Sequence, residues 1–156
     1  MTPSSVALEF DVKELPAETF AFVLRRVDPT DAGEFIGGAI ERVGRFAREH
    51  GGPAGPPLAI ASAPDEEGAL GIEAGWPVQP GTPAEAPVEV RTLAPTRAIV
   101  YRHEGPYEDL NSAFYAELFS QAHDAGFTPV SGPRERYLQA PSPGRTPVVE
   151  VVWPIA

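Results

Sequence analysis

Residues 55–78, GPPLAIASAPDEEGALGIEAGWPV, and residues 132–155, GPRERYLQAPSPGRTPVVEVVWPI, are two versions of one pattern. Aligned without gaps, they share seven identities, among them both tryptophans of the chain. A sequence that matches itself at a fixed spacing indicates a repeated structural unit. The chain is therefore predicted to contain an internal duplication with halves 6–79 and 87–155. The identities are Gly55/Gly132, Pro56/Pro133, Ala63/Ala140, Pro64/Pro141, Glu73/Glu150, Trp76/Trp153 and Pro77/Pro154.

Outward from these segments, both halves show the same order of elements, ββαββ. Alternation of apolar and polar residues predicts strands, and apolar residues spaced three or four apart predict a helix. In the first half we expect strands over 6–14, 18–27, 57–63 and 69–78, and a helix from a capping box at Asp31 and Glu34 to Gly51. In the second half we expect strands over 87–93, 97–103, 133–139 and 147–155, and a helix over 106–125.

These elements predict an α+β fold with eight antiparallel strands and two helices, in a single domain over 1–156. Neither half could close its sheet alone. Three glycines, Gly37, Gly38 and Gly44, weaken the first helix by about 1 kcal/mol each relative to Ala unless something packs closely against them.

Composition excludes several classes of protein. The net charge of −10 repels phosphate backbones, so we expect no direct binding to nucleic acid. Without cysteine there are no disulfides or thiolate metal sites, and the three histidines have no close spacing for a metal, so neither a metal nor a cofactor is expected. The first residues do not form a signal peptide, and no apolar run approaches the roughly 20 residues of a spanning helix. We expect a cytoplasmic protein without membrane contact.

The two halves differ most informatively at Glu135. In the ungapped alignment its counterpart is Leu58, and that of Tyr137 is Ile60. If the face that carries Leu58 and Ile60 is buried, Glu135 is directed at an apolar interior. A buried carboxylate is costly unless it is paired or hydrogen-bonded, which makes the position a candidate cation site. The alternative is a solvated edge, where Glu135 makes only weak surface pairs with its neighbouring arginines.

Four short segments together resemble the GyrI-like small-molecule-binding family, which includes the effector-binding domains of BmrR/Rob-type multidrug-responsive regulators. They are LPA at 15–17, HEGPY at 103–107, GPRERYL at 132–138 and WPI at 153–155. The resemblance covers about 6–155 and describes a standalone member, because the remaining residues are too few for a helix-turn-helix. It implies a curved antiparallel sheet with two helices, a central groove, and a buried glutamate among aromatic rings that binds lipophilic cations.

By this resemblance the buried glutamate is Glu135, followed by Tyr137. Aromatic faces attract cations by about 0.5–2 kcal/mol, so a carboxylate among rings suits a delocalised cation. Tyr101, aligned with Leu24 of the first half, and Tyr107 of the GPY segment are further candidates, although ordinary packing explains either one equally well. Trp76 is a weaker candidate, because a tryptophan present in both halves favours core packing.

The leading functional hypothesis is therefore a module that senses or sequesters small amphipathic, cationic or aromatic molecules, with Glu135 as counter-ion. The resemblance leaves two alternatives open: a hydrolase that opens cyclopropane-containing electrophilic toxins with Glu135 as general base, and a gyrase-interacting inhibitory protein whose acidic surface mimics DNA. A haem carrier is the weakest option, since no histidine is placed as an axial ligand. His103, aligned with Arg26, is expected to make a structural hydrogen bond that holds its turn.

Overall fold

The structure, a computed structural model, describes residues 7–140 and 142–156. In this part of the chain two helices flank one eight-stranded sheet, which confirms the predicted α+β class. The first half contains β1 (Asp11–Leu15), β2 (Glu18–Val27), α1 (Ala32–Glu49), β3 (Leu58–Ala61) and β4 (Leu70–Val78). The second half contains β5 (Glu89–Leu93), β6 (Thr96–Glu104), α2 (Ser112–Asp124), β7 (Arg134–Gln139) and β8 (Val148–Ile155).

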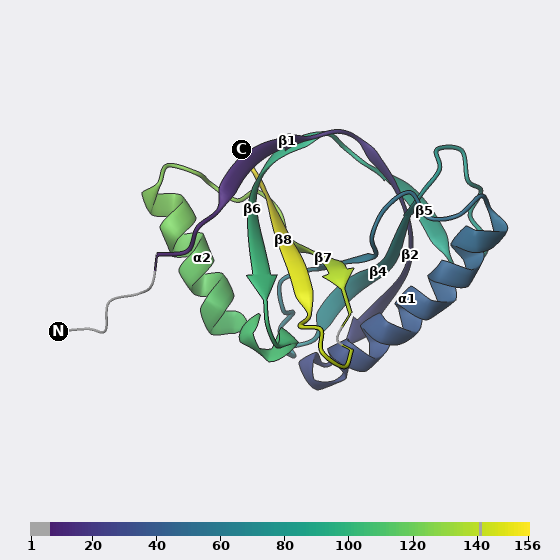
Figure 1. The fold of residues 1–156 in the computed structure, drawn as a ribbon, viewed down its shortest axis with the longest axis horizontal. Coiled ribbons are helices and arrows are strands. Elements are labelled where there is room, and N and C mark those ends of the chain that lie inside the picture. Colours follow the sequence, from purple (N-terminus) through teal and green to yellow (C-terminus); the bar gives the residue numbers. More distant parts are fainter. Residues whose placement is uncertain (1–6, 141) are drawn as a thin grey trace.

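All strand pairings are antiparallel, and the order across the sheet is β1-β6-β8-β7-β3-β4-β2-β5. The order is symmetric: when each strand of the first half is replaced by the corresponding strand of the second half, and the reverse, the same order is read from the other end. The halves join through β3 and β7, and each first strand crosses to the other half, β1 to β6 and β5 to β2. Figure 1 shows the sheet curled into a half-barrel, with α1 and α2 on its outer side. This symmetry is consistent with an internal duplication of the chain, and the duplication itself stays a prediction.

The strand register corrects the ungapped alignment in two strands. When the two tryptophans are taken as equivalent, the pairing of β3 with β4 and of β7 with β8 makes Ala59 the counterpart of Glu135. The same comparison makes Val23, and not Leu24, the counterpart of Tyr101. The alignment was wrong here because the loops of the two halves differ by one residue, and a one-residue slip moves every side chain to the opposite face of a strand.

Both faces of the sheet bury apolar side chains. The outer face packs against the helices, with Ile99 and Val151 touching α2 residues such as Leu118. The inner face carries two further apolar groups, one around Phe20, Phe22, Leu58 and Leu93 and one around Ala98, Val100 and Val152. Within the described ranges, no helix combines the length and apolar character needed to cross a membrane.

Helix α2 begins later than predicted. Residues Tyr107–Asp109 form a separate 3-10 turn, and Leu110 then leaves the helical region with φ −88° and ψ 61°. Helix α2 begins at Ser112, where the Asn111 side chain accepts a hydrogen bond from the Phe114 N–H at 3.0 Å. Asparagine is among the best N-cap residues because its side-chain oxygen satisfies an otherwise free N–H of the first turn.

The start of α1 and the first strand also differ from expectation. The predicted capping box is wrong, since Asp31 makes no side-chain cap bond; Asp28 instead accepts from the Thr30 N–H at 2.9 Å and stabilises a preceding 3-10 turn. Strand β1 begins only at Asp11. The apolar residues Leu8 and Phe10, whose alternation suggested a strand, pack on the α2 side of the core; Val6 lies outside the described residues.

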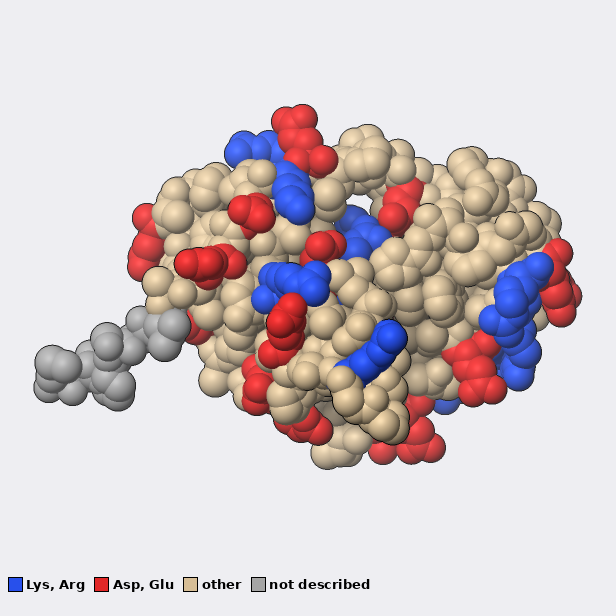
Figure 2. All heavy atoms as spheres, in the orientation of Figure 1, with Lys and Arg blue, Asp and Glu red and all other residues tan. Residues whose placement is uncertain are grey.

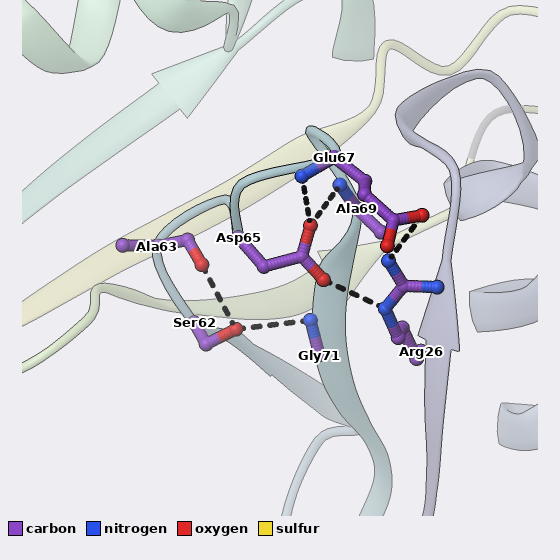
Figure 3. Close-up of polar contacts among 7 residues, drawn as sticks. All are labelled: Arg26, Ser62, Ala63, Asp65, Glu67, Ala69 and Gly71. Carbon is purple, nitrogen blue, oxygen red and sulfur yellow. Dashed lines mark hydrogen bonds and ion pairs between the residues drawn. The ribbon is translucent and has the colours of Figure 1, made fainter.

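Arg26, at the end of β2, holds the turn between β3 and β4 (Figure 3). Its Nε donates to Asp65 Oδ2 at 2.6 Å, and a terminal nitrogen lies 3.4 Å from Glu67. The other oxygen of Asp65 accepts the backbone N–H groups of Glu67 and Ala69 at 2.9 and 3.0 Å. The arginine and these N–H groups lower the pKa of the Asp65 carboxyl. The turn is thus built around one ionised carboxylate.

Candidate functional site

Glu135 lies on the outer, helix-covered face of the sheet. Strand β7 runs between β3 and β8, and the residues opposite Glu135 are Ala59 and Val151. Both neighbours are buried, and directly opposed residues in an antiparallel pair share a face. Glu135 therefore shares no face with Leu58 and Ile60, as the alignment had suggested, and points into the layer between the sheet and α2.

Both oxygens of the Glu135 carboxylate accept hydrogen bonds from tyrosines. The Tyr115 hydroxyl, from α2, donates to Oε2, and the Tyr137 hydroxyl, from β7, donates to Oε1 at 2.9 Å. Hydrogen bonds to an ionised acceptor are shorter and about twice as strong as neutral ones. The carboxylate is thus held in a fixed orientation, and the Tyr115 bond ties α2 to the central strands.

Aromatic rings from four elements, the 3-10 turn at 107–109, α2, β7 and β8, pack around the two tyrosines that hold this carboxylate. Tyr107 meets Tyr137 edge to face with centroids 5.9 Å apart, and Tyr115 meets Trp153 at 5.8 Å in the same way. Phe114 stands edge-on to Tyr115 at 5.2 Å. Edge-to-face pairs add about 0.5–1.5 kcal/mol beyond the area they bury. We call Tyr107, Phe114, Tyr115, Tyr137 and Trp153 the aromatic cup of Glu135.

The surroundings of Glu135 keep the tyrosine hydroxyls of the cup protonated. Burial, followed by the charge of Glu135 and its hydrogen bond, raises the pKa of Tyr115 far above the usual value of 10. The same causes raise the pKa of Tyr137. Burial and the charge of Glu135 also raise the pKa of Tyr107. These hydroxyls therefore remain protonated at neutral pH, so Tyr115 and Tyr137 act as hydrogen-bond donors to Glu135.

The structure brings together four of the five residues predicted from sequence. Glu135, Tyr137 and Tyr107 are in mutual reach, and Tyr101 stands behind the cup with its ring 5.2 Å from that of Phe114. Trp76 lies elsewhere, in the core between β4 and α1, where its Nε1 donates to the Ile40 carbonyl at 2.7 Å.

Sequence reasoning did not select Tyr115. It lies three residues before Leu118 and seven before Ala122, both fully buried. This helical spacing would have placed its side chain on the buried side of α2. His103, by contrast, behaves as expected: its Nε2 donates to the Pro106 carbonyl at 2.9 Å and holds the turn before α2.

A cavity of about 520 Å³ opens at a different place, between the end of β2 and the first half of α1. Its lining includes Arg25, Phe35 and Arg42, and Glu135 is not among its residues. This cavity is therefore separate from the aromatic cup. Among residues 7–140 and 142–156, no three His, Asp or Glu side chains gather closely enough to hold a metal ion.

Comparison with known proteins assigns this curled antiparallel sheet and its two helices to a family of binding domains. The chain belongs to the family of GyrI-like small molecule binding domains, whose model matches residues 8–156. No curated protein sequence matches the chain.

Several solved structures share the fold at low sequence identity. SAV2435 bound to tetraphenylphosphonium has a TM-score of 0.65 and 17% identity, over 96% of this chain and 94% of that one. The C-terminal domain of EcmrR has a TM-score of 0.70 and 18% identity, over 96% and 98%. A hydrolase from Listeria innocua has a TM-score of 0.59 and 13% identity, over 95% and 92%. At such low sequence identities, these comparisons show that the folds are alike and nothing more.

Proposed function

We propose that this protein binds lipophilic, aromatic cations between α2 and the sheet, with Glu135 as counter-ion. The observation that carries the proposal is a carboxylate held by two tyrosine hydroxyls, from Tyr115 and Tyr137, inside a wall of aromatic rings. A delocalised cation there would gain the carboxylate's charge and the faces of the rings, and these interactions impose little on the shape of the ligand. The family membership and the tetraphenylphosphonium complex of SAV2435 support this assignment.

Binding of a cation at Glu135 requires the cup to rearrange, because both carboxylate oxygens already accept hydrogen bonds from its tyrosines. The Tyr115 hydroxyl must leave Oε2 or share it, and Tyr107, which is 41% exposed, is the ring most free to swing aside. The two tyrosine hydrogen bonds satisfy the carboxylate until a cation replaces them. Binding is thus an exchange of phenol donors for a cation and aromatic contacts.

The test is calorimetric titration of the full chain with tetraphenylphosphonium. Glu135→Gln keeps the shape and removes the charge, and we expect it to weaken binding at least tenfold. Glu89→Gln is the matched control: it removes one negative charge at an exposed position on β5, and its affinity should stay within twofold of the wild type. Triphenylphosphine oxide, a neutral molecule with similar rings, should bind much more weakly. Equal affinity of the wild type and Glu135→Gln would refute the proposal.

A further inference from the structure

The inner face of the sheet carries a second charged site, on the opposite side of β7 from Glu135. Arg134 and Arg136 alternate with Glu135 along the strand, so their side chains point to the inner face. The register agrees, because Arg134 lies opposite Ile60 and Val152, which pack in the inner-face apolar groups. Figure 2 shows an opening in the middle of the molecule with basic side chains beside it and an acidic one at its edge.

Two arginines of this face are already matched by carboxylates. Arg136 makes a two-pronged pair with Glu18 of β2, at 2.9 and 3.2 Å, across the two intervening strands β3 and β4. Arg91 of β5 makes a similar pair with Glu73, at 2.6 and 3.0 Å, and its guanidinium lies 5.7 Å from the centroid of the Phe22 ring. These ion pairs fix the guanidinium groups of Arg136 and Arg91 beside the apolar residues of the inner face.

Arg134 is the exception. No carboxylate lies within ion-pair distance of it among the described residues. Its nearest charges include two further cations, Arg136 and Arg91, and the one anion near it, Glu18, is already bound to Arg136. Burial and these two cations lower the pKa of Arg134, which Glu18 offsets in part. Further carboxylates of this face include Glu150, farther along β8 and opposite Arg136 and Arg102, and Glu89, on β5 opposite Phe22; neither makes an ion pair with Arg134.

An arginine placed beside like charges on a partly buried face is unfavourable unless an anion completes the group. Among the described residues, every buried side-chain nitrogen or oxygen has a hydrogen-bond partner. The Arg134 nitrogens, for which no partner is found, therefore reach solvent. We propose that the inner face binds a small oxyanion, a carboxylate or phosphate group, through the guanidinium of Arg134 beside Arg136 and Arg91. Planar guanidinium groups match such anions with two parallel hydrogen bonds, and the partly exposed Ile60 offers an apolar surface for the rest of the molecule.

This site would be independent of the one proposed at Glu135, because the two lie on opposite faces of β7. A protein with a net charge of −10 could accept an anion here, since the charges that act on Arg134 include two further arginines, Arg136 and Arg91. A ligand carrying an anionic group would therefore bind on the inner face, and a cation on the outer one.

The experiment is an NMR titration of the isotope-labelled full chain at low ionic strength, with benzoate and inorganic phosphate as separate probes. We expect saturable shifts of β7 and β5 amides, at least tenfold weaker binding for Arg134→Gln, and an intermediate loss for Arg134→Lys, which keeps the charge but not the planar fork. Arg97→Gln, an exposed arginine on β6, is the matched control and should change the dissociation constant less than twofold.

A gain-of-function variant makes the test sharper. Glu18→Gln frees Arg136 and should tighten binding of the same probe. Preference for benzoate would indicate a carboxylate ligand with an apolar body, and preference for phosphate a phosphate group; either supports the site. Shifts that never saturate, or equal dissociation constants for the wild type and Arg134→Gln, would overturn the proposal, whatever tetraphenylphosphonium does at Glu135.

Discussion

The Tyr115 hydroxyl donates to the Glu135 carboxylate across the boundary between α2 and β7, although the two residues are 20 positions apart in the chain. This bond is a polar link between the second helix and the centre of the sheet, beside an apolar cluster that includes Leu118, Ala122 and Val151. A group that competes for the carboxylate would break this bond. If a cation binds at Glu135 as proposed, its binding would therefore be coupled to the packing of α2 through this pair.

Removing the Tyr115 hydroxyl should destabilise the fold. Tyr115→Phe leaves one oxygen of a partly buried carboxylate without its donor, and hydrogen bonds to charged groups contribute about 1.5–3 kcal/mol. We expect a loss of this size in the free energy of unfolding, measured by urea denaturation. Tyr107→Phe is the control, since that ring is 41% exposed, and it should cost less than about 0.5 kcal/mol. Equal losses in the two variants would contradict the assigned hydrogen bond.

The tyrosines of the cup should resist ionisation at high pH. Burial, the charge of Glu135 and its hydrogen bond raise the pKa values of Tyr115 and Tyr137 above the usual 10. A folded-state pKa above the unfolded one gives stability that is present below pH 10 and declines as the pH rises beyond it. Absorbance at 295 nm should show both phenols ionising only with alkaline unfolding. In Glu135→Gln, they should ionise at lower pH; an unchanged titration curve would exclude the carboxylate as a cause.

Local sequence patterns predicted the order of strands and helices because alternation and helical spacing are local properties of the chain. The RERY segment likewise placed Glu135 and Tyr137 on one face of a strand, since residues two apart in a strand share a face. The exchange of β1 and β5 between halves could not be predicted from these patterns, because strand pairing depends on tertiary packing. Tyr115 was missed for the same reason: its partner lies on another element.

The errors in counterpart residues have a single cause. The ungapped alignment assumed loops of equal length, whereas the register places Ala59, not Leu58, at the position of Glu135. In a strand, one residue decides between two faces. The sequence analysis expected Glu135 to point at apolar side chains if the face of Leu58 and Ile60 was buried; it points at apolar side chains from the opposite face, because both faces of this sheet bury them.

Glycines of α1 should respond differently to alanine. A Cβ at Gly44 would lie 3.1 Å from Trp76 Nε1, and that indole is fixed by its hydrogen bond to the Ile40 carbonyl. A Cβ at Gly37 would meet nothing within 4 Å. We expect Gly37→Ala to stabilise the fold by about 0.5–1 kcal/mol through helix propensity, and Gly44→Ala to destabilise it. Thermal and urea unfolding measure both, and stabilisation by Gly44→Ala would show that the indole can yield.

The inner-face ion pair of Arg136 and Glu18 should have a larger coupling free energy than an ion pair on the surface. Their side chains are only 13% and 26% exposed and meet in two hydrogen bonds, whereas Arg45 and Glu41 on α1 are 61% and 75% exposed and 3.7 Å apart. Double-mutant cycles with glutamine at each position isolate the coupling free energy. We expect about 1–3 kcal/mol for Arg136 and Glu18, with little change when salt is added, and at most about 0.5 kcal/mol for Arg45 and Glu41. Couplings of equal size would mean that the curled sheet does not shield its inner face from water.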